Sequence, residues 1–164
     1  MKNRLRKSSL KVLGFEFVDG AGRKALENLV ENDRRRYPLL EGVYLIIYTN
    51  QGNLHVKTLP GFEFDGRSGP RIIDWYVPNL GNLAQRICWL VHDVNGYAKD
   101  LSFKDTNVLL FAMLRDLADC RTSKANVIQL AVSVSDSWYG DPKPDEWCYK
   151  NRNLVESIFV EKCA

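Results

Sequence analysis

Two segments of the chain contain polar side chains whose types and spacing are typical of a catalytic site. The first, LPGFEFDGRSGPR at residues 59–71, offers Asp65 and Ser68 among glycines that favour an irregular path after a strand. The second, CWLVHDVNGY, contains His92, one of only two histidines, directly before Asp93. A histidine with nearby carboxylates can act as a general base, and a serine beside it can act as a nucleophile. The two segments therefore read as two halves of one site.

A pair of helices is predicted to position His92. Apolar residues recur at helical spacing through NLAQRICWLVHDV, and Gly96 follows as a stop. A second helix starts near Ser102, a typical N-cap residue, and Asp105 lies on the same face as apolar residues at i+4 and i+7. Because only a short connection separates the helices, we expect them to pack antiparallel. Asp105 is then expected to hydrogen-bond His92 and to fix the tautomer of the imidazole.

The roles of the other polar residues stay open at this point. Adjacent helical residues point about 100° apart, so Asp93 and His92 cannot both face one spot without other help. One of them is expected to face a cleft while the other closes a network. Asp65 and Ser68 are either functional groups displayed by a loop or turn-forming residues that bond the local backbone.

Length and composition are typical of one globular domain. The chain has 164 residues, of which 45% are hydrophobic and 26% charged, and a formal net charge of +3. So modest a charge leaves nucleic-acid binding unproven, because only a clustered basic face could support it. The basic start MKNRLRKSSLK is soon followed by Glu16 and Asp19, with no long apolar region. We therefore expect neither a signal peptide nor a membrane span.

The four cysteines give no sign of a metal or redox motif. Cys88, Cys120, Cys148 and Cys163 are scattered without a CxxC pair. We interpret them as free thiols in a reducing compartment. Cys88 lies in an apolar helical stretch and is most simply a small core residue.

The chain is expected to consist of an N-terminal basic arm with a short helix at residues 1–42 and a single α+β domain at residues 43–164. The helix is predicted in KALENLVENDRRRYPLL, where apolar residues recur at helical spacing before Pro38. The arginines at positions 34–36 are either a solvated helix end or a site for phosphate or an acidic partner.

The α+β domain is predicted to begin with a β-hairpin. Its strands are the run around Tyr44–Tyr48 and the alternating run from Leu54, in which His55 faces solvent, with a turn between them. Three consecutive helices follow Pro78, and the final LVESIFV is either a strand or a helix. The predicted fold is a small β-hairpin or antiparallel sheet followed by a cluster of three helices.

The order of these motifs resembles domain-of-unknown-function family 1353, which is encoded mainly by tailed bacteriophages and prophages. The resemblance rests on GF-x-FDG-x-S-x-PR, an apolar helix ending in HD with a nearby tyrosine, and an aspartate starting the next helix. It covers roughly residues 43–140. Here the tyrosine comes one residue later than expected after HD, and residues 1–42 are longer and more basic than a typical family start. The resemblance implies shared polar residues at Asp65, Ser68, His92, Asp93 and Asp105, with supporting or binding places for Pro70, Arg71 and Tyr97.

A hydrolase acting on bacterial envelope esters, amides or glycans is the first functional hypothesis. His92 would be the general base on water, and Asp93 or Asp65 would hold a divalent cation or a second proton. A helical HD pair followed by a later helical aspartate is also similar to secreted phospholipases, in which that HD aspartate binds calcium. This chain lacks the flanking disulfide cysteines of those enzymes. A second enzymatic version uses Ser68 as the nucleophile, without the G-x-S-x-G setting.

A non-enzymatic phage virion or assembly protein is the alternative hypothesis. In that case the His-Asp cluster is a buried network that makes the fold rigid without turnover. The four tryptophans and the basic arm suit contacts with other phage structural proteins or with nucleic acid. Both hypotheses place the protein in the host cytoplasm or in the virion. A small inhibitor of a host defence system is a third hypothesis, which no particular residue favours.

Overall fold

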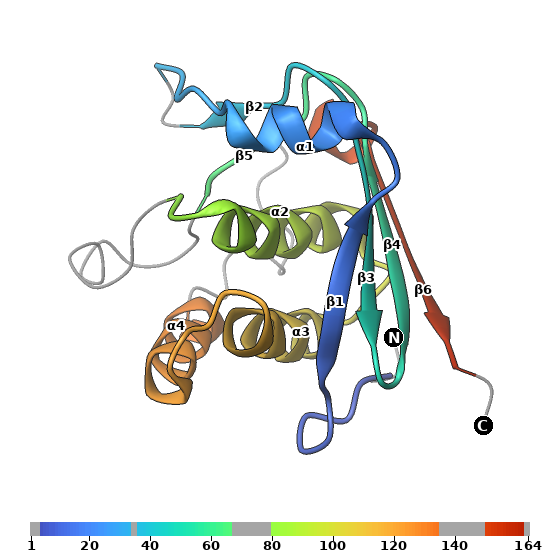
Figure 1. The fold of residues 1–164 in the computed structure, drawn as a ribbon, viewed down its shortest axis with the longest axis vertical. Helices are drawn as coiled ribbons and strands as arrows, with labels where there is room; N and C mark the ends of the chain where they lie inside the picture. The colour runs from blue at the N-terminus through green and yellow to red at the C-terminus, as the bar shows by residue number, and fades with distance from the viewer. Residues whose placement is uncertain (1–3, 34–35, 67–79, 135–149, 163–164) are drawn as a thin grey trace.

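A computed structural model of the chain describes residues 4–33, 36–66, 80–134 and 150–162. These residues form a four-stranded antiparallel sheet with helices packed on one of its faces (Figure 1). The predicted α+β class is confirmed, as are three consecutive helices after the hairpin. The elements in chain order are β1 (Val12–Phe17), α1 (Gly20–Glu27), β2 (Tyr37–Pro38), β3 (Val43–Thr49), β4 (Gly52–Thr58), β5 (Glu63–Phe64), α2 (Leu83–Ala98), α3 (Phe103–Asp116), α4 (Thr122–Val134) and β6 (Val155–Glu161).

Strands β3 and β4 form the predicted hairpin at the centre of the sheet. Leu45 pairs with Val56 and Ile47 with Leu54, and all four side chains are fully buried against the helices. Alternation along the strand then directs His55 to the opposite, outer face, as predicted. The sheet therefore has one apolar face in the core and one face turned away from the helices.

The two edge strands come from the ends of the chain. β1 pairs with β3, so residues 12–17 share a sheet with the predicted α+β domain. β6 pairs with β4 and settles the final segment as a strand. The strand order is β1-β3-β4-β6, while β2 and β5 form a separate two-stranded sheet.

The N-terminal helix differs from the predicted one. The Asp19 side chain accepts a hydrogen bond from the Gly22 amide and starts α1 at Gly20, earlier than the apolar spacing indicated. The helix ends at Glu27, ahead of the arginine run, and Pro38 lies in β2. The interpretation of the arginines as a helix end is therefore wrong for Arg36, since α1 ends at Glu27 and Arg36 directly precedes β2.

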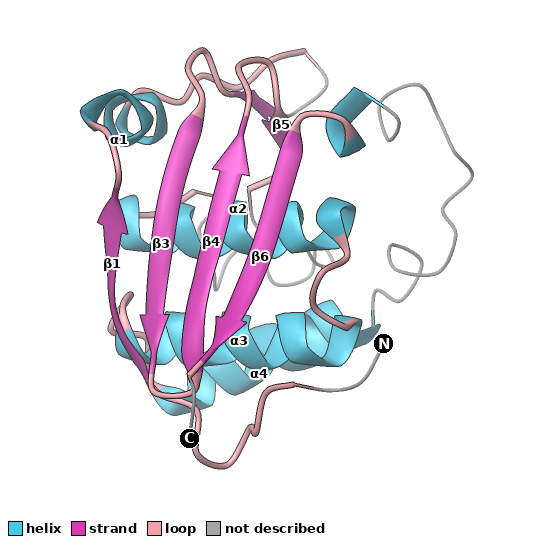
Figure 2. Ribbon diagram, turned by 90° about the vertical axis from the view of Figure 1, so that its right-hand side faces the viewer, coloured by secondary structure: helices cyan, strands magenta, loops and turns pink. Residues whose placement is uncertain are grey.

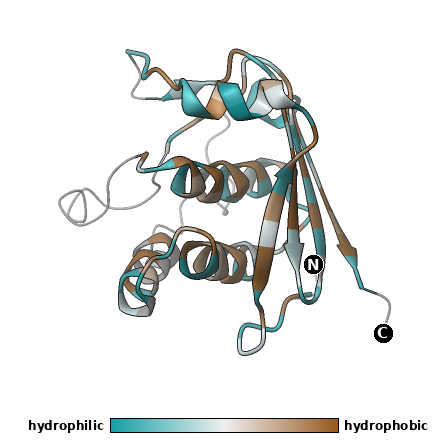
Figure 3. Ribbon diagram, viewed as in Figure 1, coloured by the Kyte–Doolittle hydropathy of each residue, from teal (hydrophilic) through white to brown (hydrophobic). Residues whose placement is uncertain are grey.

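Helix α2 is the central helix of the fold. A reciprocal capping box between Asn82 and Gln85 starts it. Every residue from Ile87 to Tyr97 is buried, because the sheet, α1 and α3 all pack around this helix. Figure 3 shows the resulting concentration of hydrophobic residues on α2 and α3. Among the described residues, no helix combines the length and the hydropathy needed to cross a membrane.

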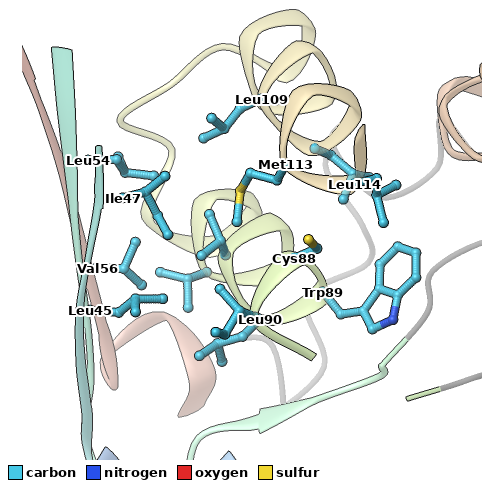
Figure 4. Close-up of a cluster of buried hydrophobic side chains, with 14 of the residues drawn as sticks. Leu45, Ile47, Leu54, Val56, Cys88, Trp89, Leu90, Leu109, Met113 and Leu114 are labelled. Atoms are coloured by element: carbon cyan, nitrogen blue, oxygen red, sulfur yellow. The ribbon is translucent and has the colours of Figure 1, made fainter. Parts of the chain in front are cut away.

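The core lies between the sheet and the α2–α3 pair (Figure 4). Leucine, isoleucine and valine side chains of β3 and β4 point toward Leu90 of α2 and Met113 of α3. Burying one such side chain stabilises a fold by about 1.5 to 3 kcal/mol. Cys88 is fully buried beside them and has no disulfide partner, as expected for a small core residue.

Candidate functional site

His92 lies in the interior of the fold, on the side of α2 that faces α3. Its side chain is only 4% exposed. The Nε2 atom lies 3.2 Å from Oδ1 of Asn107, and the Nδ1 atom lies 3.5 Å from Oδ1 of Asp93. Both ring nitrogens are therefore engaged by neighbours within the protein. A histidine in this arrangement has no ring nitrogen directed at solvent to take a proton from water.

The predicted hydrogen bond between His92 and Asp105 is wrong. Residues two apart on a helix point in nearly opposite directions, so the side chain that reaches His92 is Asn107 and not Asp105. The antiparallel packing of the two helices was a correct basis, but the helical face was misassigned. Asn107 is a site residue that the sequence reasoning missed, because an amide in an apolar helix gives no distinctive signal.

Asp105 holds the N-terminal arm instead. Its two carboxylate oxygens accept hydrogen bonds from the backbone amides of Arg4, at 2.7 Å, and Leu5, at 3.1 Å. The side chain is 1% exposed and lies in the first turn of α3, whose Ser102 cap is confirmed. A carboxylate near a helix N-terminus is stabilised by the helix dipole, which helps to offset the cost of its burial. The described contacts of Asp105 are therefore structural.

Asp93 joins α2 to the chain that carries Asp65. It is fully buried, and its Oδ2 atom accepts a hydrogen bond from the Asp65 backbone amide at 3.1 Å. Its Oδ1 atom lies 3.5 Å from Nδ1 of the His92 ring, which is long for a hydrogen bond. Two roles were expected for the HD pair, facing a cleft and closing a network. The contacts of Asp93 fit the second role.

Asp65 is the acid of the cluster that remains partly open to solvent. It follows β5 directly, and its side chain is 31% exposed. Its Oδ1 atom is buried and has no hydrogen-bond partner among the described residues. The same atom lies 3.8 Å from Nε of Arg36, which is close enough for an ion pair. Gly66 follows with a φ of 71°, a left-handed conformation that favours glycine.

The surroundings of Asp65 change its acidity. Burial, and next the negative charge of Asp93, raise the pKa of the Asp65 carboxyl from its ordinary 3.8 to about 7, while Arg36 lowers it in part. A carboxyl group with a carboxylate nearby is harder to ionise, since two negative charges repel each other in a poorly solvated place. The protonation of Asp65 therefore changes near neutral pH.

The segment that carries Asp65 is fixed by residues from distant parts of the chain. The buried Asn151 side chain donates to the Glu63 carbonyl at 2.7 Å and accepts from the Glu63 amide at 3.2 Å. Tyr97, one turn after Asp93 on α2, packs edge-on against Phe62 with ring centroids 5.9 Å apart. Asn151 was missed by the sequence reasoning, because its partner is backbone and has no residue-type signal.

Some predicted residues cannot be placed. Ser68, Pro70 and Arg71 lie in residues 67–79, outside the described part of the chain. Tyr97 is 7% exposed, so its predicted binding role stays a prediction. Within the described ranges, no group of three or more His, Cys, Asp or Glu side chains is arranged to hold a metal ion.

The chain matches no family model, no curated protein and no solved structure. The resemblance to family 1353 therefore stays a prediction. The site is defined by its own geometry: a partly exposed Asp65 above a buried chain of Asp93, His92 and Asn107.

Proposed function

We propose that this protein is a hydrolase in which the Asp65 carboxyl is the acid-base group. One observation carries the proposal: the buried Oδ1 atom of Asp65 has no hydrogen-bond partner among the described residues. By contrast, both oxygens of Asp105 accept from backbone amides, while Asp93 has an amide at Oδ2 and the His92 ring at Oδ1. Buried polar atoms are normally satisfied, so a carboxyl group with one unsatisfied buried oxygen, on a side chain that is still 31% exposed, is a candidate functional group.

The chemistry follows from the pKa of about 7 for Asp65. At neutral pH both the ionised and the protonated forms of such a carboxyl are abundant, which suits general acid-base catalysis. The carboxylate takes a proton from water as the water oxygen attacks a carbonyl carbon and forms a tetrahedral intermediate. The resulting carboxyl then returns that proton to the departing oxygen or nitrogen. Arg36, 3.8 Å from the Oδ1 atom, supplies positive charge beside the reacting groups.

His92 and Asp93 become positioning residues in this proposal. The hydrogen bond from the Asp65 amide to Asp93 fixes the backbone on which the reactive carboxyl stands. His92 contacts Asp93, and Asn107 of α3 in turn contacts His92. Groups that hold a catalytic side chain within a fraction of an ångström contribute to the rate without touching the substrate.

The substrate class and setting come from the resemblance to a phage family. Bacterial envelope esters, amides or glycans remain the proposed substrates, with the host cytoplasm or the virion as the proposed location. A divalent cation stays a prediction for this site. Ser68 as the nucleophile of an alternative enzymatic version, and Arg71 as a binding group, stay predictions.

The proposal is tested with the substitution Asp65→Asn, which keeps the shape of the side chain and removes its titration. Suitable probes are p-nitrophenyl acetate, an acetylated amino-acid p-nitroanilide and dye-labelled peptidoglycan. We expect the wild-type protein to release product from at least one probe and the variant to be slower by about 100-fold or more. Asp33→Asn, at an exposed aspartate, is the matched control and should keep the wild-type rate. Equal rates for wild type and Asp65→Asn, or no wild-type turnover on any probe, would contradict the proposal.

The non-enzymatic assembly protein remains a second candidate, and the burial of His92 favours it. A histidine that is 4% exposed and bound at both ring nitrogens is what a purely structural network requires. This candidate predicts no turnover by the wild-type protein. It also predicts that Asp65→Asn leaves every function of the protein intact.

A further inference from the structure

The outer face of the sheet is free of the helices that cover the inner face. Figure 2 views this face directly, with α2, α3 and α4 behind the strands. Two apolar side chains of β6 project from it, Ile158 at 48% exposure and Val160 at 53%. Apolar side chains gathered on one face of a folded domain mark a candidate interaction surface.

A shallow hollow of about 220 Å³ lies on this face. Its polar side is the Tyr44–His55 pair, in which the Tyr44 hydroxyl and Nδ1 of His55 are 3.1 Å apart. The Lys57 ammonium group lies 4.6 Å from the centroid of the Tyr44 ring and 3.8 Å from a Glu156 carboxylate oxygen. We call the residues that line the hollow the outer patch: Tyr44, His55, Lys57, Glu156, Ile158 and Val160.

On each edge of the same sheet, a backbone amide donates a hydrogen bond to an aspartate carboxylate. On β1, the Val12 amide donates to Oδ2 of Asp116 at 2.8 Å. On β6, the Phe159 amide donates to Oδ2 of Asp100 at 2.8 Å. An added strand would have to displace these charge-assisted hydrogen bonds and meet the carboxylates. Association through the sheet is therefore directed to its face and away from its edges.

We propose that the outer patch binds a second copy of this chain, with the two sheets stacked face to face. Lys57 on β4 pairs directly with Glu156 on β6, so the patch has a positive and a negative group at the same height along the strands. A two-fold axis parallel to the strands, midway between β4 and β6, exchanges these two positions. It sets Lys57 of each copy opposite Glu156 of the other.

The same rotation also places the other patch residues of β4 and β6 opposite one another or opposite a neighbour in the strand. His55 pairs with Ile158, and Asn53 pairs with Val160, in the register of β4 and β6. The axis therefore brings His55 of one copy over Ile158 of the other, and the projecting apolar chain enters the opposing hollow. The charges of Lys57 and Glu156 are therefore self-complementary under one symmetry operation, which is what a two-fold interface needs.

The size of the face limits the strength of the dimer. The axis lays β4 and β6 of one copy over β6 and β4 of the other, and these strands have seven residues each. With strands about 4.8 Å apart and a rise of about 3.4 Å per residue, they present roughly 230 Å². Stable interfaces bury about 800 Å² on each partner. The dimer should accordingly be weak and reversible, with a dissociation constant of about 10 to 500 µM.

Sedimentation velocity with charge-reversed variants tests the proposal. The wild-type average mass should rise from 18.8 kDa toward twice that value between about 10 and 500 µM. Lys57→Glu alone and Glu156→Lys alone should each associate at least about tenfold more weakly, because like charges then face each other. An equimolar mixture of the two variants should regain wild-type association, since every facing pair becomes opposite in charge.

The equimolar mixture of the two variants distinguishes a contact between copies from the ion pair within one chain. Within each single variant the positions 57 and 156 carry like charges, and mixing does not change that. The side chains are 49% and 56% exposed, so folding is not at risk, and circular dichroism melting verifies it. Ile158→Glu should also abolish association, whereas Leu40→Glu, at an exposed leucine elsewhere, should not.

Two results would overturn the proposal. One is a wild-type protein that stays at 18.8 kDa up to about 500 µM. The other is a mixture of Lys57→Glu and Glu156→Lys that associates no better than either variant alone. The patch is distinct from Asp65, so neither result bears on the proposed chemistry.

Discussion

The acids near His92 differ in what their oxygens contact. Asp93 and Asp105 accept hydrogen bonds from backbone amides, whereas Oδ1 of Asp65 accepts none from the described residues. Sequence reasoning placed Asp65, Asp93 and Asp105 around His92, but Asp105 binds the N-terminal arm and not the histidine. The sequence could not rank these acids, since the distinction depends on which backbone amides approach each carboxylate.

The raised pKa of Asp65 gives the fold a pH dependence. Between 3.8 and about 7 the folded protein holds the Asp65 proton more tightly than the unfolded chain does. The stability that this proton contributes is fully present below pH 3.8 and is lost as the pH rises through about 7. The side chain of Asp65→Asn cannot ionise, so the variant does not lose this stability as the pH rises.

We expect Asp65→Asn to be more stable than wild type at pH 8 and nearly equal to it at pH 4. A shift of this size corresponds to at most about 4 kcal/mol, and solvent at a 31% exposed side chain reduces it to about 1 to 2 kcal/mol. Urea denaturation at the two pH values measures the difference. A variant whose stability differs from wild type equally at both pH values would show that Asp65 titrates normally.

The elements of the fold are tied together by carboxylates from the α2–α3 region. Four aspartates accept hydrogen bonds from backbone amides of segments far away in the chain. Asp93 accepts from the Asp65 amide, Asp100 from the Phe159 amide, Asp105 from the Arg4 and Leu5 amides, and Asp116 from the Val12 amide. Such contacts were not predictable, because backbone amides occur at almost every residue.

Asp105→Ala tests this at the N-terminal arm. Removing the carboxylate leaves the amides of Arg4 and Leu5 without their acceptor, and a hydrogen bond to a charged group contributes about 1.5 to 3 kcal/mol. Amide hydrogen exchange of Leu5 should therefore become at least about tenfold faster. Asp33→Ala, at an exposed position, should leave that rate unchanged. Unchanged exchange in Asp105→Ala would mean that other contacts hold the arm.

Helices were easier to predict than strands. The apolar period and the caps of α2 and α3 are local, and Ser102 starts α3 as expected. Strand β1 was not predicted, because its burial does not alternate regularly and its register shifts between Val12 and Gly14. β6 stayed undecided between strand and helix, since a seven-residue apolar run fits both.

At the scale of the whole molecule, the large sheet is assembled from three distant parts of the chain. The β3–β4 hairpin is local, but β1 and β6 add to it from residues 12–17 and 155–161. Pairing across such distances depends on the helices that bring the ends together, which no local pattern reports. The sheet covers the helices on one side and leaves the outer patch on the other.

This arrangement separates two surfaces of the protein. Asp65 follows the small β2–β5 sheet, whereas the outer patch lies on the face of the large sheet. A dimer formed through the outer patch would leave Asp65 and Arg36 uncovered. The proposed chemistry and the proposed association can therefore be measured independently in one protein.

The acidity of Asp65 itself is the most direct test of the site. Carbon-13 NMR of aspartate carboxyls, titrated from about pH 3 to 9, reports each pKa, and Asp65→Asn identifies the Asp65 signal. The account predicts a titration midpoint of about 7 for Asp65. A midpoint near the ordinary 3.8 would contradict it, because the carboxyl would then be permanently ionised at neutral pH.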